Sequence, residues 1–415
     1  MSGPRVLLLA LGTRGDVEPF ARLGQTLRAQ GYDVTAAVLA DGAPRLERAG
    51  VRAVVVGPTA DHAMWSPRPM VRRAAHLNPG LMYLQLRLAL STHAPELARG
   101  LAPLLTEADV VISGLPTARL VPLLTARGVP ARLVLMAPLL PDPYGTSAWS
   151  HPVADRLPGA VEDYRQRMLW RMTTGLSSAL AEALTAEVGR PSQRPGRHLA
   201  TAYPPVLATS AALHPDAAPD LHRVGWWVDP APVRPLPTDL TAHLDGHPGA
   251  VLLALGSMPT TWPDRQADRL AGVARSLGRP AVVQVAGARP GPRGSSYVVG
   301  DVDHRSLLPR VAAVAHHGGS GTTHAVTSAG VPQVVLPHLG DQAHYARQVH
   351  RAGLGPAPLP WVRAADGPLT ARLARVLDDP GYAERARAAA AVMGREDGLR
   401  TTVRLVDTMT GTMTR

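Results

Sequence analysis

Short, continuous apolar runs alternate along this chain with longer stretches rich in Arg and Leu. Residues 5–11 form the first such run, an amphipathic stretch over 17–30 follows, and residues 34–39 form the next run. Strands of a parallel sheet are apolar along their whole length because helices cover both faces of the sheet. The alternation therefore predicts an α/β fold built on doubly wound parallel sheets.

This alternation occurs twice, on either side of a proline-rich segment. Residues 229–239 read DPAPVRPLPTD, with four prolines in eleven residues, and such a segment suits an extended connector. Strands are expected before it at 51–56, 110–113 and 132–136, and after it at 251–255, 281–285, 311–316 and 333–336. We therefore predict Rossmann-like domains over 1–220 and 241–395, a linker over 221–240, and a final helix over 396–415 that returns to the first domain.

The composition is that of a globular protein with two cores. The chain has 415 residues, too many for one typical core, and 45% of them are hydrophobic. Its formal charge of +11 comes from 43 basic side chains, all of them Arg, and 32 acidic ones. Because the arginines are dispersed, we expect a solvated surface and no nucleic-acid partner. The absence of Cys excludes disulfides, thiolate nucleophiles and Cys-based metal sites.

The sequence predicts no stable membrane insertion. Its opening, MSGPRVLLLALGTRG, contains an apolar run, but Arg14 and Asp16 follow at once without a small-residue cleavage site. We interpret this run as a buried strand. A membrane span needs about 18 uncharged apolar residues, a length that no run here reaches. We therefore expect a cytoplasmic protein, either a monomer or a homodimer.

Each predicted domain opens with a strand that ends in glycine. The first reads LLLALGTRGDVEP over 7–19, and the second reads VLLALGSMPTTW over 251–262. Open α/β sheets bind their ligands at the carboxyl ends of parallel strands. We therefore expect the two loops to face each other across a cleft between the domains.

A glycine-rich segment, HHGGSGTT over 316–323, lies between a predicted strand and a predicted helix over 322–329. Glycines let backbone N–H groups approach an anion, and a helix amino terminus favours negative charge. The segment is neither the NTPase phosphate loop, which needs Lys, nor the G-x-G-x-x-G fingerprint. It therefore predicts a cradle for a diphosphate, and a tight turn without ligand is the alternative.

At this point the residues resemble a known family. The run HHGGSGTT, followed by AGVPQVVLP over 329–337 and DQAHYA over 341–346, is similar to the donor-binding region of family-1 glycosyltransferases. The opening GTRGDVEPF over 12–20 resembles the bacterial branch that glycosylates antibiotics, related to glycopeptide and sterol glycosyltransferases. The resemblance implies the GT-B fold. It also implies an inverting enzyme that moves a hexose from a UDP- or dTDP-sugar to a hydroxyl of a lipophilic natural product.

The resemblance also assigns residues of the second domain to the nucleotide sugar. Asp341 and Gln342 match the pair that contacts sugar hydroxyls, and Ser257 lies on the phosphate or ribose side. Val302 and His304 belong to the loop beside the nucleobase. The diphosphate is assigned to five residues of the glycine-rich segment: His317, Gly319, Ser320, Gly321 and Thr322. Ala325 departs from the family, in which a Glu is often present.

Asp16 is the expected catalytic residue. In the family an acidic residue or a histidine at this position removes the proton of the acceptor hydroxyl, and a positioned carboxylate can act as such a base. The alternative makes Asp16 the N-cap of the helix that follows it. We expect Glu18 to be a favourable first-turn charge on that helix.

No metal or other cofactor is expected beside the nucleotide sugar. Residues 301–303 spell D-x-D, a cation site in a different glycosyltransferase fold, but here they fall in the predicted nucleobase loop. His316 and His317 should point to opposite faces if the strand continues through both, which argues against joint chelation. We expect His316 to be a structural residue at the end of the strand.

The acceptor is expected in the first domain. Met and aromatic residues gather near 63–83 and 141–172 in a protein that is only 4% aromatic, and such a lining suits a lipophilic aglycone. Packing of helices against one another is the alternative for any one of these side chains. The candidate acceptor-binding residues are Thr13, Arg14, Met64, Trp65, Tyr83 and Trp149.

Two other functions compete with sugar transfer. A nucleotide-sugar epimerase can share the two-domain architecture, although Asp16 and the apolar segments of the first domain do not suit it. An auxiliary protein that activates a true transferase is the other alternative, against which the near-complete set of motifs argues.

Overall fold

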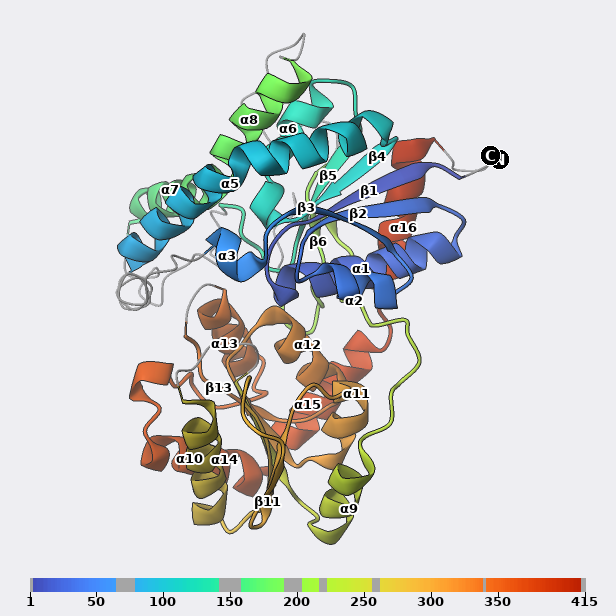
Figure 1. Ribbon diagram of the computed structural model, residues 1–415. Helices are drawn as coiled ribbons and strands as arrows, with labels where there is room; N and C mark the ends of the chain where they lie inside the picture. The colour runs from blue at the N-terminus through green and yellow to red at the C-terminus, as the bar shows by residue number, and fades with distance from the viewer. Residues whose placement is uncertain are drawn as a thin grey trace. The chain divides into compact units, whose positions relative to one another are not determined.

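The computed structural model describes residues 3–64, 79–141, 158–189, 204–215, 222–255, 262–338 and 341–411. The chain divides into two compact units (Figure 1). The first unit consists of Met1–Ala208, Ala217–Ala231 and Asp397–Arg415, and the second of Thr209–Asp216 and Pro232–Glu396. The chain therefore enters the second unit briefly at residue 209, within the range assigned to the first domain, before it moves there at Pro232.

A seven-stranded parallel sheet forms the centre of the first unit, with the order β3-β2-β1-β4-β5-β6-β7. The strands are β1 (Arg5–Ala10), β2 (Asp33–Leu39), β3 (Arg52–Gly57), β4 (Val110–Ser113), β5 (Ala131–Leu135), β6 (Val206–Leu207) and β7 (His222–Arg223). The helices are α1 (Arg14–Ala29), α2 (Ala43–Arg48), α3 (Ala60–Met64), α5 (Pro79–Glu107), η1 (Leu115–Thr117), α6 (Leu120–Thr125), α7 (Gly159–Gly175), α8 (Ser178–Val188) and α16 (Gly398–Thr410). The strands predicted from apolar runs are thus present, each within two residues of its expected ends.

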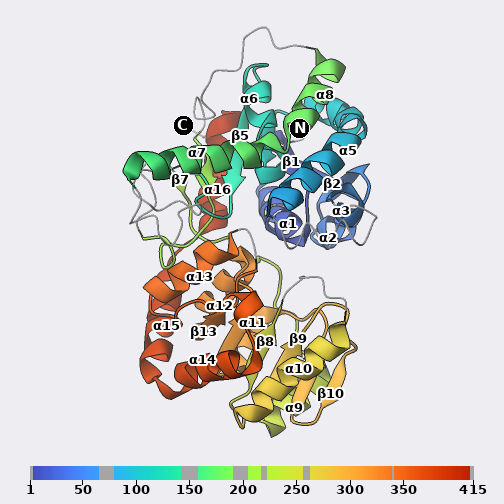
Figure 2. The ribbon, with the colours of Figure 1, turned by 90° about the vertical axis from the view of Figure 1, so that its left-hand side faces the viewer.

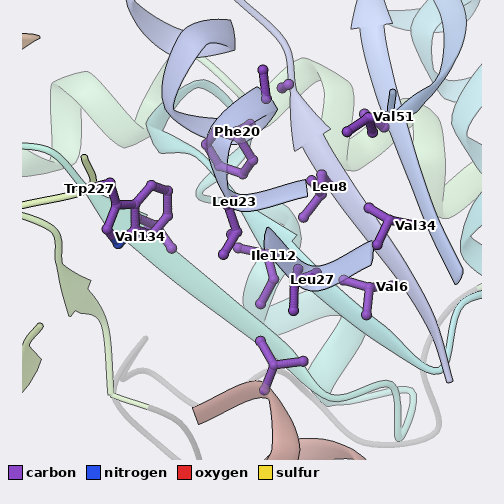
Figure 3. Close-up of a cluster of buried hydrophobic side chains, with 14 of the residues drawn as sticks. Val6, Leu8, Phe20, Leu23, Leu27, Val34, Val51, Ile112, Val134 and Trp227 are labelled. Carbon is purple, nitrogen blue, oxygen red and sulfur yellow. The ribbon is translucent and has the colours of Figure 1, made fainter. Parts of the chain in front are cut away.

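Distant parts of the chain share the core of the first unit. Leu8 of β1 and Leu23 of α1 pack in one cluster with Trp227 (Figure 3). Val406 of α16 belongs to the same cluster, and the indole N–H of Trp227 donates to the Thr402 hydroxyl at 3.0 Å. A buried indole N–H needs such a partner. The carboxyl-terminal helix is therefore a structural part of the first unit.

The second unit contains a six-stranded sheet with the order β10-β11-β9-β8-β12-β13. Its strands are β8 (Val251–Ala254), β9 (Ala281–Gln284), β10 (Gly291–Arg293), β11 (Ser296–Val299), β12 (Ala313–His316) and β13 (Gln333–Val335). Its helices are α9 (Thr238–Gly246), α10 (Pro263–Ser276), α11 (His304–Leu307), η3 (Leu308–Arg310), α12 (Ser320–Ser328), α13 (Gln342–Arg351), η4 (Trp361–Arg363), α14 (Asp366–Asp378) and α15 (Pro380–Met393). All pairings are parallel except that of β10 with β11.

Helices cover both faces of this second sheet. Val251 and Leu253 of β8 belong to a cluster with residues of α10 and α14, whereas Leu252 and Ala254 belong to another with residues of α9 and α12. Successive side chains of a strand point to opposite faces, so both faces of β8 are buried. Figure 2 shows α10, which contacts β9, on one of these faces. The predicted fold class, two doubly wound α/β units, is confirmed.

None of the helices in the described ranges is long and apolar enough to cross a membrane.

Candidate active site

The loop after β1 brings Asp16 back onto its own turn. Thr13 is the N-cap of α1, and Asp16, three residues later, completes a capping box with it. The Asp16 Oδ2 atom accepts hydrogen bonds from the backbone N–H of Thr13 at 2.8 Å and from the Thr13 hydroxyl at 3.0 Å. Such a box satisfies donors that a helix end would otherwise leave without partners. The alternative that made Asp16 itself the N-cap is therefore wrong, because the helix begins earlier, at Arg14.

Gly12 makes this arrangement possible. Its φ is +154°, and a Cβ there would lie 2.4 Å from Asp16 Oδ2. Any side chain at position 12 would therefore push the Asp16 carboxylate out of the turn. Both Thr13 hydrogen bonds go to Oδ2, so Thr13 does not engage Oδ1.

Burial raises the pKa of the Asp16 carboxyl above its ordinary value, and the hydrogen bonds from Thr13 oppose this shift. Burial acts in this direction because it penalises the charged form. A carboxylate with a raised pKa is a stronger base than a solvated one. Perturbed carboxyls of this kind are typical of functional sites.

Glu18 has a different role from the one expected. The acidic residue in the first turn of α1 is Asp16, and Glu18 lies beyond that turn. Its carboxylate pairs with Arg45 of α2, and Arg14 lies 4.0 Å away. Glu18 therefore connects α1 to α2 rather than complementing the helix dipole. Two candidate acceptor-binding residues of the same loop and helix start, Thr13 and Arg14, are exposed.

In the second unit the glycine-rich segment lies between β12 and α12. Gly318 has a φ of +87°, Gly319 is the N-cap, and α12 begins at Ser320 rather than at Thr322 as predicted. The first backbone N–H to donate within the helix is that of Thr323, which bonds to Gly319 O at 2.9 Å. The N–H groups before it point out of the end of the helix, as at every helix amino terminus. This end is therefore a suitable site for an anion.

The two adjacent histidines have different environments. His316 is fully buried, its Nε2 lies 2.7 Å from Gln333 Oε1, and its Nδ1 accepts the N–H of Gly318 at 3.1 Å. Both ring nitrogens thus form hydrogen bonds within the protein, in agreement with the structural role expected for His316. His317 is only partly buried, yet its Nδ1 is buried without a hydrogen-bond partner.

Burial, and then three nearby histidines, lower the pKa of His317 to about 3. At neutral pH His317 is therefore an uncharged imidazole with one N–H to donate. Its ring lies against Gly319, because a Cβ on that glycine would be 2.5 Å from His317 Nε2. The ring consequently shares the amino-terminal end of α12 with the backbone N–H groups.

The start of α13 meets the same glycine-rich turn. A Cβ on Gly318 would lie 3.1 Å from the backbone oxygen of Gln342, so the two segments are in close contact. Asp341 is the N-cap of α13, and the Gln342 side-chain oxygen accepts the N–H of His338 at 2.8 Å. The structure thus brings Gln342, predicted to contact sugar, next to the segment predicted to hold the diphosphate.

The predicted nucleobase loop is held by its own ion pairs. Asp303 caps α11 and pairs with Arg305 at 2.7 Å, and these hydrogen bonds lower the pKa of its carboxyl despite burial. Asp301 lies 3.9 Å from Arg234. The D-x-D carboxylates therefore have protein cations as partners. Val302 and His304 are partly buried, and His304 Nε2 lies 3.1 Å from Gln284 Oε1.

The structure places only some of the other predicted residues. Ser257, Trp65 and Trp149 lie outside the described residues, and Met64 is described only as the last residue of α3. Tyr83 is in α5, where its hydroxyl would lie 3.5 Å from a Cβ on Gly175 of α7. This position is compatible with helix packing as well as with contact to an acceptor.

Sequence reasoning missed three residues near the start of α12. His324 is fully buried one turn into the helix, and Tyr345 reaches Ser320 from α13. His338 stacks on Trp361 with ring centroids 4.7 Å apart. The only signal in the sequence was that these polar and aromatic residues flank the recognised motifs, which does not reveal their contacts.

Comparisons with known proteins extend over the whole chain. Residues 294–397 match the family described as Erythromycin biosynthesis protein CIII-like, C-terminal domain. The O-mycaminosyltylonolide 6-deoxyallosyltransferase of Streptomyces fradiae is 30% identical over 99% of this chain and 98% of its own length. The vancomycin aglycone glucosyltransferase of Amycolatopsis orientalis is 32% identical over 97% of each chain. The structure of the glycosyltransferase VinC in complex with dTDP is similar with a TM-score of 0.65 and 20% identity, over 98% of this chain and all of that one.

Proposed function

Because the chain belongs to the antibiotic branch of the family-1 glycosyltransferases, which have the GT-B fold, we propose that it transfers a hexose from a UDP- or dTDP-sugar to a hydroxyl of a lipophilic natural product. The transfer proceeds in one displacement that inverts the anomeric carbon. Asp16 is the general base, and neither a metal nor another cofactor takes part.

The start of α12 carries this proposal. The helix presents its outward N–H groups at Gly319 and Ser320, and the His317 ring lies against Gly319 with its Nε2 side. No carboxylate belongs to this segment, so nothing there repels a diphosphate. As the glycosidic bond breaks, negative charge grows on the departing diphosphate, and donors already in position stabilise it.

A neutral His317 suits this buried diphosphate site better than a charged one. Phosphate oxygens accept hydrogen bonds, and an uncharged His317 can donate one without the cost of burying a cation. The N–H groups and dipole of α12 supply the positive potential instead. Thr322, in the first turn of the helix, offers a further hydroxyl.

Asp16 suits the role of base on the acceptor side. Its Oδ2 atom is held by Thr13, and its pKa is raised by burial, so the carboxylate is both oriented and basic. It acts as base in its ionised form, which the hydrogen bonds from Thr13 favour. Removal of the acceptor proton as the oxygen attacks typically accelerates such reactions by about 10²–10⁴-fold.

The acceptor class rests on relatives and on the first unit. One relative is named for a tylonolide and another for the vancomycin aglycone. The candidate acceptor residues in the described ranges include Thr13 and Arg14, which are exposed beside Asp16, and Tyr83 of α5. We accordingly propose a lipophilic aglycone that presents its hydroxyl to Asp16.

A mass-spectrometric screen tests this function. The purified chain is incubated with UDP- and dTDP-hexoses and a panel of macrolide, glycopeptide and polyketide aglycones, with and without EDTA. We expect one aglycone to gain the mass of a hexose residue, equally well in EDTA. Altered sugar without any acceptor would instead indicate an epimerase. Intact donor binding with turnover only after addition of a partner protein would indicate an auxiliary role.

A further inference from the structure

A buried hydrogen-bond network lies beneath the first residue of α12. The Ser320 hydroxyl is 3.0 Å from the Tyr345 hydroxyl, and Tyr345, His324 and Thr209 are all fully buried. Thr209 belongs to the short segment Thr209–Asp216 that the chain contributes to the second unit. Because buried donors and acceptors must satisfy one another, the contacts determine where each proton lies.

The tautomer of His324 determines which group donates in each hydrogen bond of the network. Its Nδ1 lies 2.8 Å from the backbone oxygen of Ser320, which can only accept, so Nδ1 carries the proton. Its Nε2 accepts the backbone N–H of Ser210 at 3.2 Å, so Nε2 carries a lone pair. The Thr209 hydroxyl, 2.8 Å from this Nε2, must therefore donate its proton to it.

Thr209 then has no proton left for its other neighbours. Its oxygen lies 2.7 Å from His214 Nδ1, which must be the donor in that contact. The Tyr345 hydroxyl also bonds to Thr209, and burial raises the Tyr345 pKa, so this hydroxyl keeps its proton and donates it. The Tyr345 oxygen can consequently only accept from Ser320.

We propose that this network takes up the hydroxyl proton of Ser320, so that Ser320 meets the nucleotide sugar as a hydrogen-bond acceptor and recognises a sugar hydroxyl rather than a phosphate oxygen. A phosphate oxygen at neutral pH offers no proton to such an acceptor, whereas a sugar hydroxyl does. Tyr345 is the positioning residue, and Ser320 contacts the donor.

The neighbours of Ser320 support a sugar as its partner. Tyr345 lies in the first turn of α13, the helix that begins with Gln342, and Gln342 contacts Gly318. Ser320 thus lies at the amino-terminal end of α12 and contacts the helix that begins with the pair proposed to bind sugar hydroxyls. The His324 Nδ1–H group, 3.5 Å from Ser320 Oγ, also faces that oxygen as a donor. This inference rests on the proposed function.

Binding measurements with and without the sugar test the inference. Isothermal titration compares UDP with UDP-glucose, and dTDP with dTDP-glucose, for the wild type, Ser320→Ala, Tyr345→Phe and His317→Ala. Ser328→Ala, an exposed hydroxyl at the other end of α12, is the matched control. We expect Ser320→Ala to weaken the nucleotide sugar about fivefold and the nucleoside diphosphate less than twofold.

Tyr345→Phe should release the Ser320 proton. UDP-glucose binding is then expected to weaken, whereas UDP binding should stay the same or tighten, because the serine can now donate to phosphate. Should this variant not fold, as judged by its circular dichroism, the two affinities of Ser320→Ala decide alone. Nitrogen-15 NMR of the wild type should in addition show His324 as the Nδ1–H tautomer.

The outcomes separate this inference from the proposed function. Equal losses of UDP and UDP-glucose affinity in Ser320→Ala, or no loss of either, would overturn the inference while His317→Ala still weakened both ligands. A wild-type protein that bound none of the four nucleotides would overturn the proposed function, and the inference with it.

Discussion

At the scale of single residues, Asp16 has a structural role in the helix cap, and we propose a chemical role for it as well. Its Oδ2 atom closes the capping box of α1, and its burial raises its pKa. From the sequence, helix capping competes with catalysis as the explanation for this residue, although both roles can hold together. The structure shows the capping geometry, in which Gly12 leaves room for the carboxylate and Thr13 engages only one of its oxygens.

Asp16→Asn separates the two roles. The amide oxygen can still accept the Thr13 hydrogen bonds, but the amide cannot remove a proton. We expect the rate of transfer to fall at least about 100-fold, with the nucleotide-sugar affinity and the melting temperature unchanged.

Asp16→Ala is the comparison variant. It loses the capping interaction as well, so its unfolding free energy should fall by roughly 1 kcal/mol. Steady-state kinetics, titration calorimetry and thermal melting check these values. Full activity in Asp16→Asn would remove Asp16 from the role of base.

At the scale of elements, the turn between β12 and α12 depends on Gly318. This residue has a φ of +87°, and a Cβ on it would lie 2.6 Å from Val335 Cγ1 of β13 and 3.1 Å from the Gln342 backbone. A side chain there would therefore strain the turn and separate it from α13. The sequence predicted the strand, the turn and the helix. It placed the helix start at Thr322, because Ser320 and Gly321, the first two residues of α12, are of types common in turns.

Gly318→Ala should damage the turn, whereas Gly321→Ala should not. We expect the first to lose roughly 2–4 kcal/mol of stability, from the positive φ and the clash together, and to bind UDP or dTDP more weakly. Gly321 has an open environment and lies in the helix, so Ala there should be neutral or slightly stabilising. Chemical denaturation of both variants and nucleotide titration of Gly318→Ala check this, and an equal stability of the two variants would contradict it.

At the scale of the whole molecule, buried neutral histidines make stability depend on pH. Burial lowers the pKa of His316 and His324 to about 4 and that of His344 to about 3, all in the second unit. In the unfolded chain these groups titrate near 6.5. Between these values the unfolded chain binds more protons than the folded one, so stability falls as the pH falls below about 6.5.

Each fully buried histidine should cost roughly 3 kcal/mol of stability at pH 4 relative to pH 7. We expect thermal melting of the full chain to shift steeply downward over this range. Hydrogen exchange should speed up first in peptides from β12 and α12, which contain His316 and His324, rather than in β1 and α1. A melting temperature that did not change between pH 7 and pH 4.5 would contradict this account.

The sequence by itself determined the α/β class, most of the strands and the glycine-containing loops after β1 and β12. Apolar runs and glycines act locally, since strand burial and turn geometry depend on a few neighbouring residues. The short antiparallel pairing of β10 with β11 was missed because the strands have only three and four residues and GPR contains no apolar run.

Tertiary structure alone decided which distant residues form hydrogen bonds with one another and pack in the same core. Thr209, His324 and Tyr345 are separated by up to 136 residues, yet they form one network. The same holds for Trp227 and Thr402, whose hydrogen bond joins α16 to the first core. Such contacts form because buried polar groups must find partners wherever packing brings them together, and packing depends on the whole chain.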